Sequence, residues 1–333
     1  MSERSAVLFV PMQEEMEYAY NTLKSRGGTC SLDYDKKTDR YPFTWTLGSR
    51  TIVTVYLKVI GDHGNLRTAT RMAQTLIDVD PYFCLLVGIG GAMEPPGNRT
   101  LGLEDVVIST RVKTLYPDKV KRRDASKEDY APGLPIQLDQ EKKFLTDSFF
   151  RFRRDAIQWQ DSTFLLDGYL KHLNGGTAAP LSLYPVTPDT VNGLDLTQQN
   201  PKPKVAQGTI FSSEMVIDSD EYIDYLIRKN LSDASDYYVQ KDGKNHPRQG
   251  WFSSTIPVAD MESLGFFEMI GNLKGRITTT HAVSVRGISD FASQKQNLDE
   301  TTFDKVREKA VANAITVALD MLDWSGALNP GKR

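Results

Sequence analysis

Short apolar runs that alternate with helix-period segments are the feature that most constrains this chain. Phe83 to Val87 is continuous and apolar, as a strand covered on both faces should be, and Asp105 to Ser109 repeats the pattern. Between an earlier run at Ala6 to Val10 and Phe83, apolar residues recur at helical spacing over Asn65 to Val79, and Asp80-Pro81 ends that segment. Because this alternation is typical of strands exchanged with helices around a buried sheet, it predicts an α/β layered domain.

The same alternation resumes after residue 204, so we expect one domain over residues 1–333. The remaining predicted strands are Phe43 to Leu47 and Thr51 to Val59, which would form a hairpin, then Val205 to Phe211, Thr255 to Ala259 and His281 to Ile288. The remaining predicted helices are Glu14 to Ser25, Ser219 to Lys229, Ser263 to Asn272 and Thr302 to Leu322.

Two polar stretches, 111–204 and 231–254, interrupt this pattern and are predicted to be insertions within the domain. The first carries a basic run from Lys119 to Arg123, for which a solvated surface is the simplest interpretation. An amphipathic helix is also expected in it, from the helical spacing of Leu145, Phe149, Phe152, Ala156 and Trp159.

Composition excludes several classes of protein. The 333 residues are 40% hydrophobic and 25% charged with a net charge of −3, which is ordinary globular composition without the basic excess that attracts nucleic acid. No apolar run approaches the roughly 18 residues of a membrane span, and the two cysteines, Cys30 and Cys84, supply no disulfide framework or metal knuckle. We therefore expect a cytoplasmic protein without a metal, a nucleic-acid partner or a membrane partner.

Four short motifs follow predicted strands directly. They are Glu14-Glu15, the glycine-rich stretch Gly88 to Met93, Asp260-Met261-Glu262 and Ser289-Asp290. Each also has an ordinary structural interpretation as a solvated first helical turn, a tight turn or a helix cap. A parallel or mixed sheet would gather these strand ends into one crevice, and several carboxylic acids there would suit acid/base chemistry on a small molecule.

The glycine-rich stretch does not match the fingerprints of nucleotide cofactor sites. Met93 stands where a dinucleotide-binding loop has its third glycine, Pro95-Pro96 would break the helix that must follow, and the stretch lacks a P-loop lysine. We therefore expect no nicotinamide or other organic cofactor.

The motifs, in this order, resemble those of the nucleoside phosphorylase/nucleosidase superfamily, and are most similar to those of the 5′-methylthioadenosine/S-adenosylhomocysteine nucleosidases. The resemblance covers roughly residues 5–110, 205–230 and 255–323. The strings that carry it are Val10-Pro-Met-Gln-Glu-Glu15, Val87-Gly-Ile-Gly-Gly-Ala92, Leu103-Glu-Asp-Val-Val-Ile108, Glu214-Met-Val-Ile217, Val258-Ala-Asp-Met-Glu262 and Val285-Arg-Gly-Ile-Ser-Asp290.

The resemblance implies a three-layer α/β/α sandwich with a mixed central sheet that cleaves the N-glycosidic bond of a purine nucleoside. By motif position, Asp290 matches the general acid that protonates purine N7, and Ser289 supports it. Glu15 matches the base that activates water. These roles fit the chemistry, because the departing base needs a proton while the sugar becomes oxocarbenium-like.

The same resemblance implies the substrate-binding residues. Glu262 and Met261 match the segment that binds the ribose hydroxyls, with Asp260 in place of the first acid of that family string. Backbone around Val216 matches the part that reads the purine edge, and Ile89-Gly90 matches the turn beneath sugar and base. Val216 itself stands where the family usually has an aromatic residue that packs on the purine.

Two departures favour hydrolysis over phosphorolysis. The phosphorylases of the superfamily hold phosphate with an Arg before the glycine turn and a Ser or Thr within it, and Leu86 and Ile89 occupy those places here. The alternative is a phosphate-dependent purine nucleoside phosphorylase that uses Arg67, Arg111 or Arg286.

The 5′ substituent of the substrate is left open by the sequence. We place methylthioadenosine-like substrates first and AMP or ATP second, because a thioether tail needs an apolar pocket whereas a phosphate needs fixed cations. A different class of function is a non-catalytic nucleotide-sensing module.

Family members commonly complete the 5′ pocket with a neighbouring subunit, so the resemblance also implies a homodimer, with its interface near Tyr116 or the helix after the glycine turn.

Overall fold

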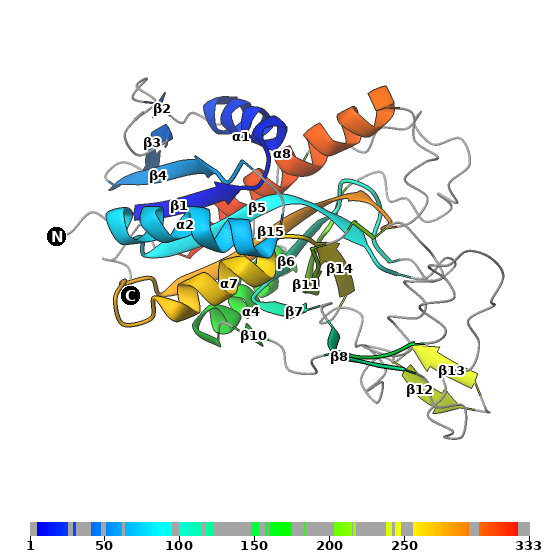
Figure 1. Cartoon of the computed structure of the whole chain (residues 1–333). Coiled ribbons are helices and arrows are strands. Elements are labelled where there is room, and N and C mark those ends of the chain that lie inside the picture. Colours follow the sequence, from blue (N-terminus) through cyan, green and yellow to red (C-terminus); the bar gives the residue numbers. More distant parts are fainter. Residues whose placement is uncertain are drawn as a thin grey trace.

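Most strands of the protein join in one mixed sheet (Figure 1). The computed structural model describes residues 5–25, 29–30, 41–47, 51–61, 64–94, 100–114, 117–122, 148–152, 157–158, 160–174, 183, 203–214, 216–217, 238–241, 244–247, 256–292 and 300–325. Within these residues the strand order of the main sheet is β10-β7-β11-β6-β15-β5-β1-β4-β3-β2, and β14 pairs with both β11 and β5.

The strands of this sheet are β1 (Ser5–Val10), β2 (Thr29–Cys30), β3 (Tyr41–Leu47), β4 (Thr51–Val59), β5 (Phe83–Ala92), β6 (Val106–Ser109), β7 (Arg111–Thr114), β10 (Ile157–Gln158), β11 (Val205–Ser212), β14 (Ile256–Asp260) and β15 (His281–Asp290). At its centre β1, β5 and β15 are parallel, whereas β6 is antiparallel to β15 and β14 is antiparallel to β5. The sheet is therefore mixed, as predicted.

Helices cover both faces of the sheet. The described helices are α1 (Gln13–Ser25), α2 (Asn65–Val79), α4 (Gln160–Asn174), α7 (Ser263–Asn272) and α8 (Glu300–Trp324). Figure 1 shows α1 and α8 on one side of the sheet and α2 and α7 on the other. None of the described helices has both the length and the hydropathy that crossing a membrane requires.

The alternation of side chains along β1 explains the three layers. Leu8 packs in the core under α1, α4 and α8, while Val7 and Phe9 pack in the core under α2 and α7. Successive side chains of a strand point to opposite faces, so an entirely apolar strand can feed both cores. The predicted three-layer α/β/α sandwich is confirmed.

The glycine-rich stretch is part of a strand, and the turn expected there is wrong. β5 continues through Gly88 to Ala92, because β15 pairs with it along this length and β14 pairs with its last two residues. The glycines allow these neighbours to approach. A Cβ on Gly88 would lie 2.7 Å from Nη1 of Arg286, and one on Gly90 would lie 2.7 Å from Cγ1 of Val258.

The amphipathic helix expected from Leu145 to Trp159 is also wrong. Ser148–Phe152 is strand β9, which pairs antiparallel with β8 (Pro117–Arg122), and α4 begins only at Gln160. The local sequence Ser-Phe-Phe-Arg-Phe is rich in aromatic residues, which favour strands, and this preference outweighs the wider helical spacing. Leu145, Ala156 and Trp159 lie outside the described residues.

Parts of the predicted insertions contribute to the main fold. Within 111–204, β7 joins the sheet and α4 places Leu166 and Tyr169 in the core beside α8. Within 231–254, β12 (Tyr238–Lys241) and β13 (Lys244–Pro247) form a hairpin. The helix expected over 219–229 lies outside the described residues, and the division of the chain into one domain with two insertions stays a prediction.

Candidate active site

All nine predicted site residues line one cavity of about 150 Å³. Three come from the proposed catalytic set, and the others come from the proposed substrate-binding set. They are Glu15, Ser289, Asp290, Ile89, Gly90, Val216, Asp260, Met261 and Glu262.

The mixed sheet brings these residues together from two directions. β5 and β15 run parallel, so Gly91 near the end of β5 pairs with Asp290 at the end of β15. β14 approaches antiparallel to β5, with Ala259 paired to Gly91, so its terminal Asp260 also reaches the cavity. Parallel strand ends alone would not have assembled this site.

Asp290 is fixed at the cavity wall by two hydrogen bonds. Oδ2 accepts a hydrogen bond from the Ser289 hydroxyl at 2.8 Å, and Oδ1 accepts one from the Ala292 amide at 2.8 Å. A Cβ on Gly91 would lie 2.6 Å from Asp290 Oδ1, so only glycine lets β5 pass so close to the carboxyl group. The carboxyl group is thus buried and oriented, with 5% of the residue exposed.

Glu15 is a buried carboxyl group, unlike the solvated first-turn acid that is its ordinary interpretation. Only 2% of the residue is exposed, and its oxygens accept hydrogen bonds from the amides of Met12 and Ile89 at 3.2 Å each. Burial, followed by the negative charge of Glu262, raises the pKa of Glu15 from 4.5 to about 7, against the opposing effects of Arg286 and these amides. Glu15 is therefore suited to hold or release a proton near neutral pH.

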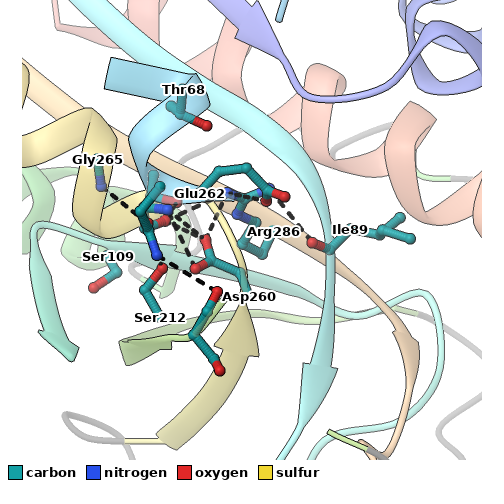
Figure 2. Close-up of polar contacts among 12 residues, drawn as sticks. Thr68, Ile89, Ser109, Ser212, Asp260, Glu262, Gly265 and Arg286 are labelled. Carbon is teal, nitrogen blue, oxygen red and sulfur yellow. Dashed lines mark hydrogen bonds and ion pairs between the residues drawn. The ribbon is translucent and has the colours of Figure 1, made fainter. Parts of the chain in front are cut away.

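Arg286, which the sequence suggests only as a possible phosphate ligand, is the residue that holds the other acids of the cavity in place. It is fully buried on β15, and its Nη2 donates to Asp260 at 2.6 Å and to Glu262 at 3.5 Å (Figure 2). Its Nη1 lies 3.4 Å from the carbonyl oxygen of Ile89. One cation therefore holds two acids and one backbone group of the cavity wall.

The capping interpretation holds for Asp260 and fails for Glu262. Asp260 accepts hydrogen bonds from the amide and hydroxyl of Ser263, the first residue of α7, in addition to its ion pair with Arg286. Glu262 occupies the N-cap position but makes no side-chain capping hydrogen bond. Its carboxylate instead lines the cavity.

The segment that carries Val216 is anchored to α2. Glu214 accepts a hydrogen bond from the Asn65 amide at 2.8 Å, and Asn65 Oδ1 in turn accepts from the Ser212 hydroxyl and from the amide of Gly265 in α7. Val216 lines the cavity and is 63% exposed. The larger aromatic side chain that the family usually has at this position would cover more of the cavity. Hydrogen bonds therefore connect the start of α2, the start of α7 and the segment of the cavity wall that carries Val216.

Arg307 of α8 also lines the cavity and was not foreseen. Its only sequence signal is its position one turn beyond Phe303 in a long amphipathic helix, which does not distinguish it from a solvated arginine.

The described residues contain no cluster of three or more side chains able to hold a metal ion.

The mixed sheet and the two helical layers form an α/β/α sandwich with an acid-lined cavity at the ends of β5, β14 and β15. No family model and no curated protein matches the sequence. Solved structures do match. A mutant 5′-methylthioadenosine nucleosidase from Helicobacter pylori with 5′-methylthioadenosine in its active site aligns with 97% of this chain and 100% of its own, with a TM-score of 0.54 and 14% identity.

Two further solved structures match over similar lengths. Futalosine hydrolase from Helicobacter pylori covers 96% of this chain and 98% of its own, with a TM-score of 0.53 and 13% identity. A putative 5′-methylthioadenosine/S-adenosylhomocysteine nucleosidase from Borrelia burgdorferi bound to adenine covers 95% and 98%, with a TM-score of 0.53 and 15% identity. The chain therefore shares the fold of these nucleosidases, the proteins whose motifs its sequence resembles.

Proposed function

We propose that this protein is a purine nucleoside or nucleotide N-ribohydrolase. The observation that carries the proposal is that Glu15 and Asp290, the predicted water base and general acid, line the same cavity in different environments. Asp290 is oriented by Ser289 and the Ala292 amide, whereas burial and Glu262 raise the pKa of Glu15. Two carboxyl groups of one cavity that are held by different neighbours can take different parts in a reaction, as a paired acid and base must.

The proposed reaction divides the work among these groups. Asp290 donates a proton to N7 of the purine as the glycosidic bond breaks, and Glu15 takes a proton from the attacking water. Glu262, held by Arg286, binds the ribose hydroxyls and stabilises the positive charge that develops on the sugar. No step requires a metal or an organic cofactor.

The environment of Arg286 favours water over phosphate as the nucleophile. Of the three arginines that a phosphorylase was expected to use, Arg286 is engaged by Asp260 and Glu262, while Arg67 and Arg111 do not line the cavity. A phosphate bound beside Arg286 would compete with two carboxylates that are already in place.

Product analysis tests this proposal directly. Adenosine, methylthioadenosine, AMP and ATP should be incubated with the protein in phosphate-free buffer containing a chelator. We expect free adenine and a free sugar without any phosphate present, and no sugar 1-phosphate when phosphate is added. Formation of ribose 1-phosphate would instead establish phosphorolysis, and binding without any release of base over hours would favour the nucleotide-sensing module.

The raised pKa of Glu15 predicts the pH dependence of the reaction. The base acts only when ionised, so kcat/KM should rise as the pH increases through about 7. Glu15→Gln should lower kcat/KM by about 10²- to 10⁴-fold and abolish this rise. Glu14→Gln is the matched control, because Glu14 is exposed on the same helix. An unchanged pH profile in Glu15→Gln would exclude Glu15 as the base.

The same shift gives the sign of its effect on stability. The folded carboxyl group binds its proton up to about pH 7, whereas the unfolded one loses it near 4.5. Between these values the folded state binds more protons, so the contribution of Glu15 to the free energy of unfolding falls as the pH rises.

We further propose that the protein forms a homodimer. Leu66 and Ile77 of α2 are 75% and 54% exposed, and their spacing of 11 residues puts them on one face of the helix. This face of α2 is not one of the two expected interface regions: Tyr116 lies outside the described residues, and the described residues 100–114 that follow the glycine-rich stretch form β6 and β7 and no helix.

Light scattering at low micromolar concentration should give a mass near twice the 37.4 kDa of the chain. Glu substitutions at Leu66 and Ile77 together should give the monomer. A wild-type monomer with full activity would contradict the dimer.

A further inference from the structure

Arg307 supplies the one positive charge among the described residues that line the cavity. The other ionisable groups of the lining are the carboxyl groups of Glu15, Asp260, Glu262 and Asp290. Arg286 lies behind this wall and is engaged by Asp260 and Glu262. The interactions described so far therefore do not explain why a positive charge lies among these acids.

The Arg307 side chain is held in place without being fully paired. Its guanidinium carbon lies 5.4 Å from the centre of the Phe303 ring, which orients the planar group. Nη1 is 3.8 Å from Asp304 Oδ1, which is beyond hydrogen-bond distance, and the Asp304 side chain is 55% exposed. Such exposed pairs contribute little free energy.

The Nε of Arg307 gives the second observation. This atom is buried and makes no hydrogen bond to the described residues. Nε therefore adds no partner that commits the guanidinium to the protein, and because 20% of the Arg307 side chain is exposed, a ligand would meet its exposed part and not the buried Nε. Guanidinium groups bind carboxylates and phosphates through two parallel hydrogen bonds, which is the geometry such a ligand would use.

The 5′ end of the nucleoside is the part of the proposed substrate that has no binding residue yet, and Arg307 is the lining residue that could bind it. Asp290 and Val216 are assigned to the purine, and Met261 and Glu262 to the ribose hydroxyls. Arg307 belongs to α8, which packs against α1, the helix that places Glu15 in the cavity. Arg307 is the one basic lining residue among those described, and the proposed reaction assigns it no part of the purine, the ribose diol or the attacking water.

We propose that the substrate is a purine nucleoside with an anionic 5′ substituent, a carboxylate or a phosphate, and that Arg307 binds that group. This inference rests on the proposed function and reverses the order of substrates expected from the sequence, in which the neutral thioether came first. Binding by a single arginine in an acidic cavity favours one compact anionic group over an extended polyphosphate.

Steady-state kinetics on matched substrates tests the inference. Adenosine and methylthioadenosine are the neutral substrates, and AMP and adenosine 5′-carboxylate are the anionic ones. We expect the wild-type protein to prefer at least one anionic substrate over adenosine in kcat/KM by about 10- to 100-fold, the effect of hydrogen bonds to a charged group. The member of the pair that is preferred identifies the source of the charge.

Two variants and one control separate charge recognition from packing. Arg307→Met should remove the preference for the anion while changing kcat/KM for adenosine less than about threefold, and Arg307→Lys should restore part of it. Lys305→Met removes an exposed positive charge from the same helix and should leave the preference intact. Equal losses on neutral and anionic substrates in Arg307→Met would overturn the inference.

A binding measurement distinguishes failure of this inference from failure of the proposed function. If no substrate releases base, the hydrolase proposal fails, and calorimetric titration with AMP, adenosine 5′-carboxylate and adenosine still tests Arg307. We then expect the better-binding anion to bind Arg307→Met about 10- to 100-fold more weakly than wild type, with adenosine unchanged. Equal affinities of wild type and Arg307→Met for both anions would overturn the inference on its own.

Discussion

Asp290→Asn is expected to lower kcat for base release by about 10²- to 10⁴-fold while the protein remains folded. Asparagine keeps an oxygen that can accept the hydrogen bond from the Ala292 amide, and its amide group can donate to the Ser289 hydroxyl. The variant therefore retains the local structure but has no proton to give to the purine.

The comparison needs a control that makes the same chemical change elsewhere. Asp78→Asn alters an exposed aspartate on α2 and should leave kcat and stability unchanged. Base release should be followed together with the circular dichroism of each variant. If Asp290→Asn cleaves every nucleoside at the wild-type rate, Asp290 is not the general acid.

Arg286→Met is expected to reduce the free energy of unfolding by about 3–5 kcal/mol. The substitution fills much of the same volume but leaves Asp260 and Glu262 without their cation, and Glu15 adds a third acid nearby. Removing one partner of a buried ion pair is strongly destabilising because the remaining charge stays out of water. The midpoint of denaturant unfolding measures the loss.

A double variant shows whether charge is the cause. Asp260→Asn combined with Arg286→Met removes one of the unpaired charges, so its loss of stability should be smaller than the sum of the two single losses. Arg276→Met is the matched control, since Arg276 is exposed and its replacement should change stability by less than about 0.5 kcal/mol. A loss in Arg286→Met no larger than in Arg276→Met would show that the acids need no cation.

Local sequence patterns predicted much of the fold. The apolar periodicity between Asn65 and Val79, ended by Asp80-Pro81, gives α2 with the observed bounds, and Ser263 to Asn272 gives α7. Both helices depend on interactions within a few residues, which the sequence displays directly. The nine site residues were likewise found from strand ends and family resemblance, and they line one cavity.

Local sequence patterns predicted the wrong secondary structure where a strand partner distant in sequence determines the conformation. Gly88 to Ala92 has the composition of a turn, yet β14 and β15 pair with it and extend β5. The helical spacing of Phe149 and Phe152 predicts a helix, whereas Ser148–Phe152 forms a strand that pairs with β8. In both cases the hydrogen bonds that stabilise the strand come from residues far along the chain.

The sequence by itself determined the layered α/β architecture and the residues of the candidate site, because both the apolar periodicity and the acidic motifs at the strand ends can be recognised from the order of residues alone. Only the tertiary structure decided the electrostatics of that site. Arg286 meets Asp260 across two strands, the Ile89 amide reaches Glu15 from 74 residues away, and Arg307 arrives from α8. These contacts depend on how strands and helices pack in three dimensions, and the same packing buries Glu15 and raises its pKa to about 7.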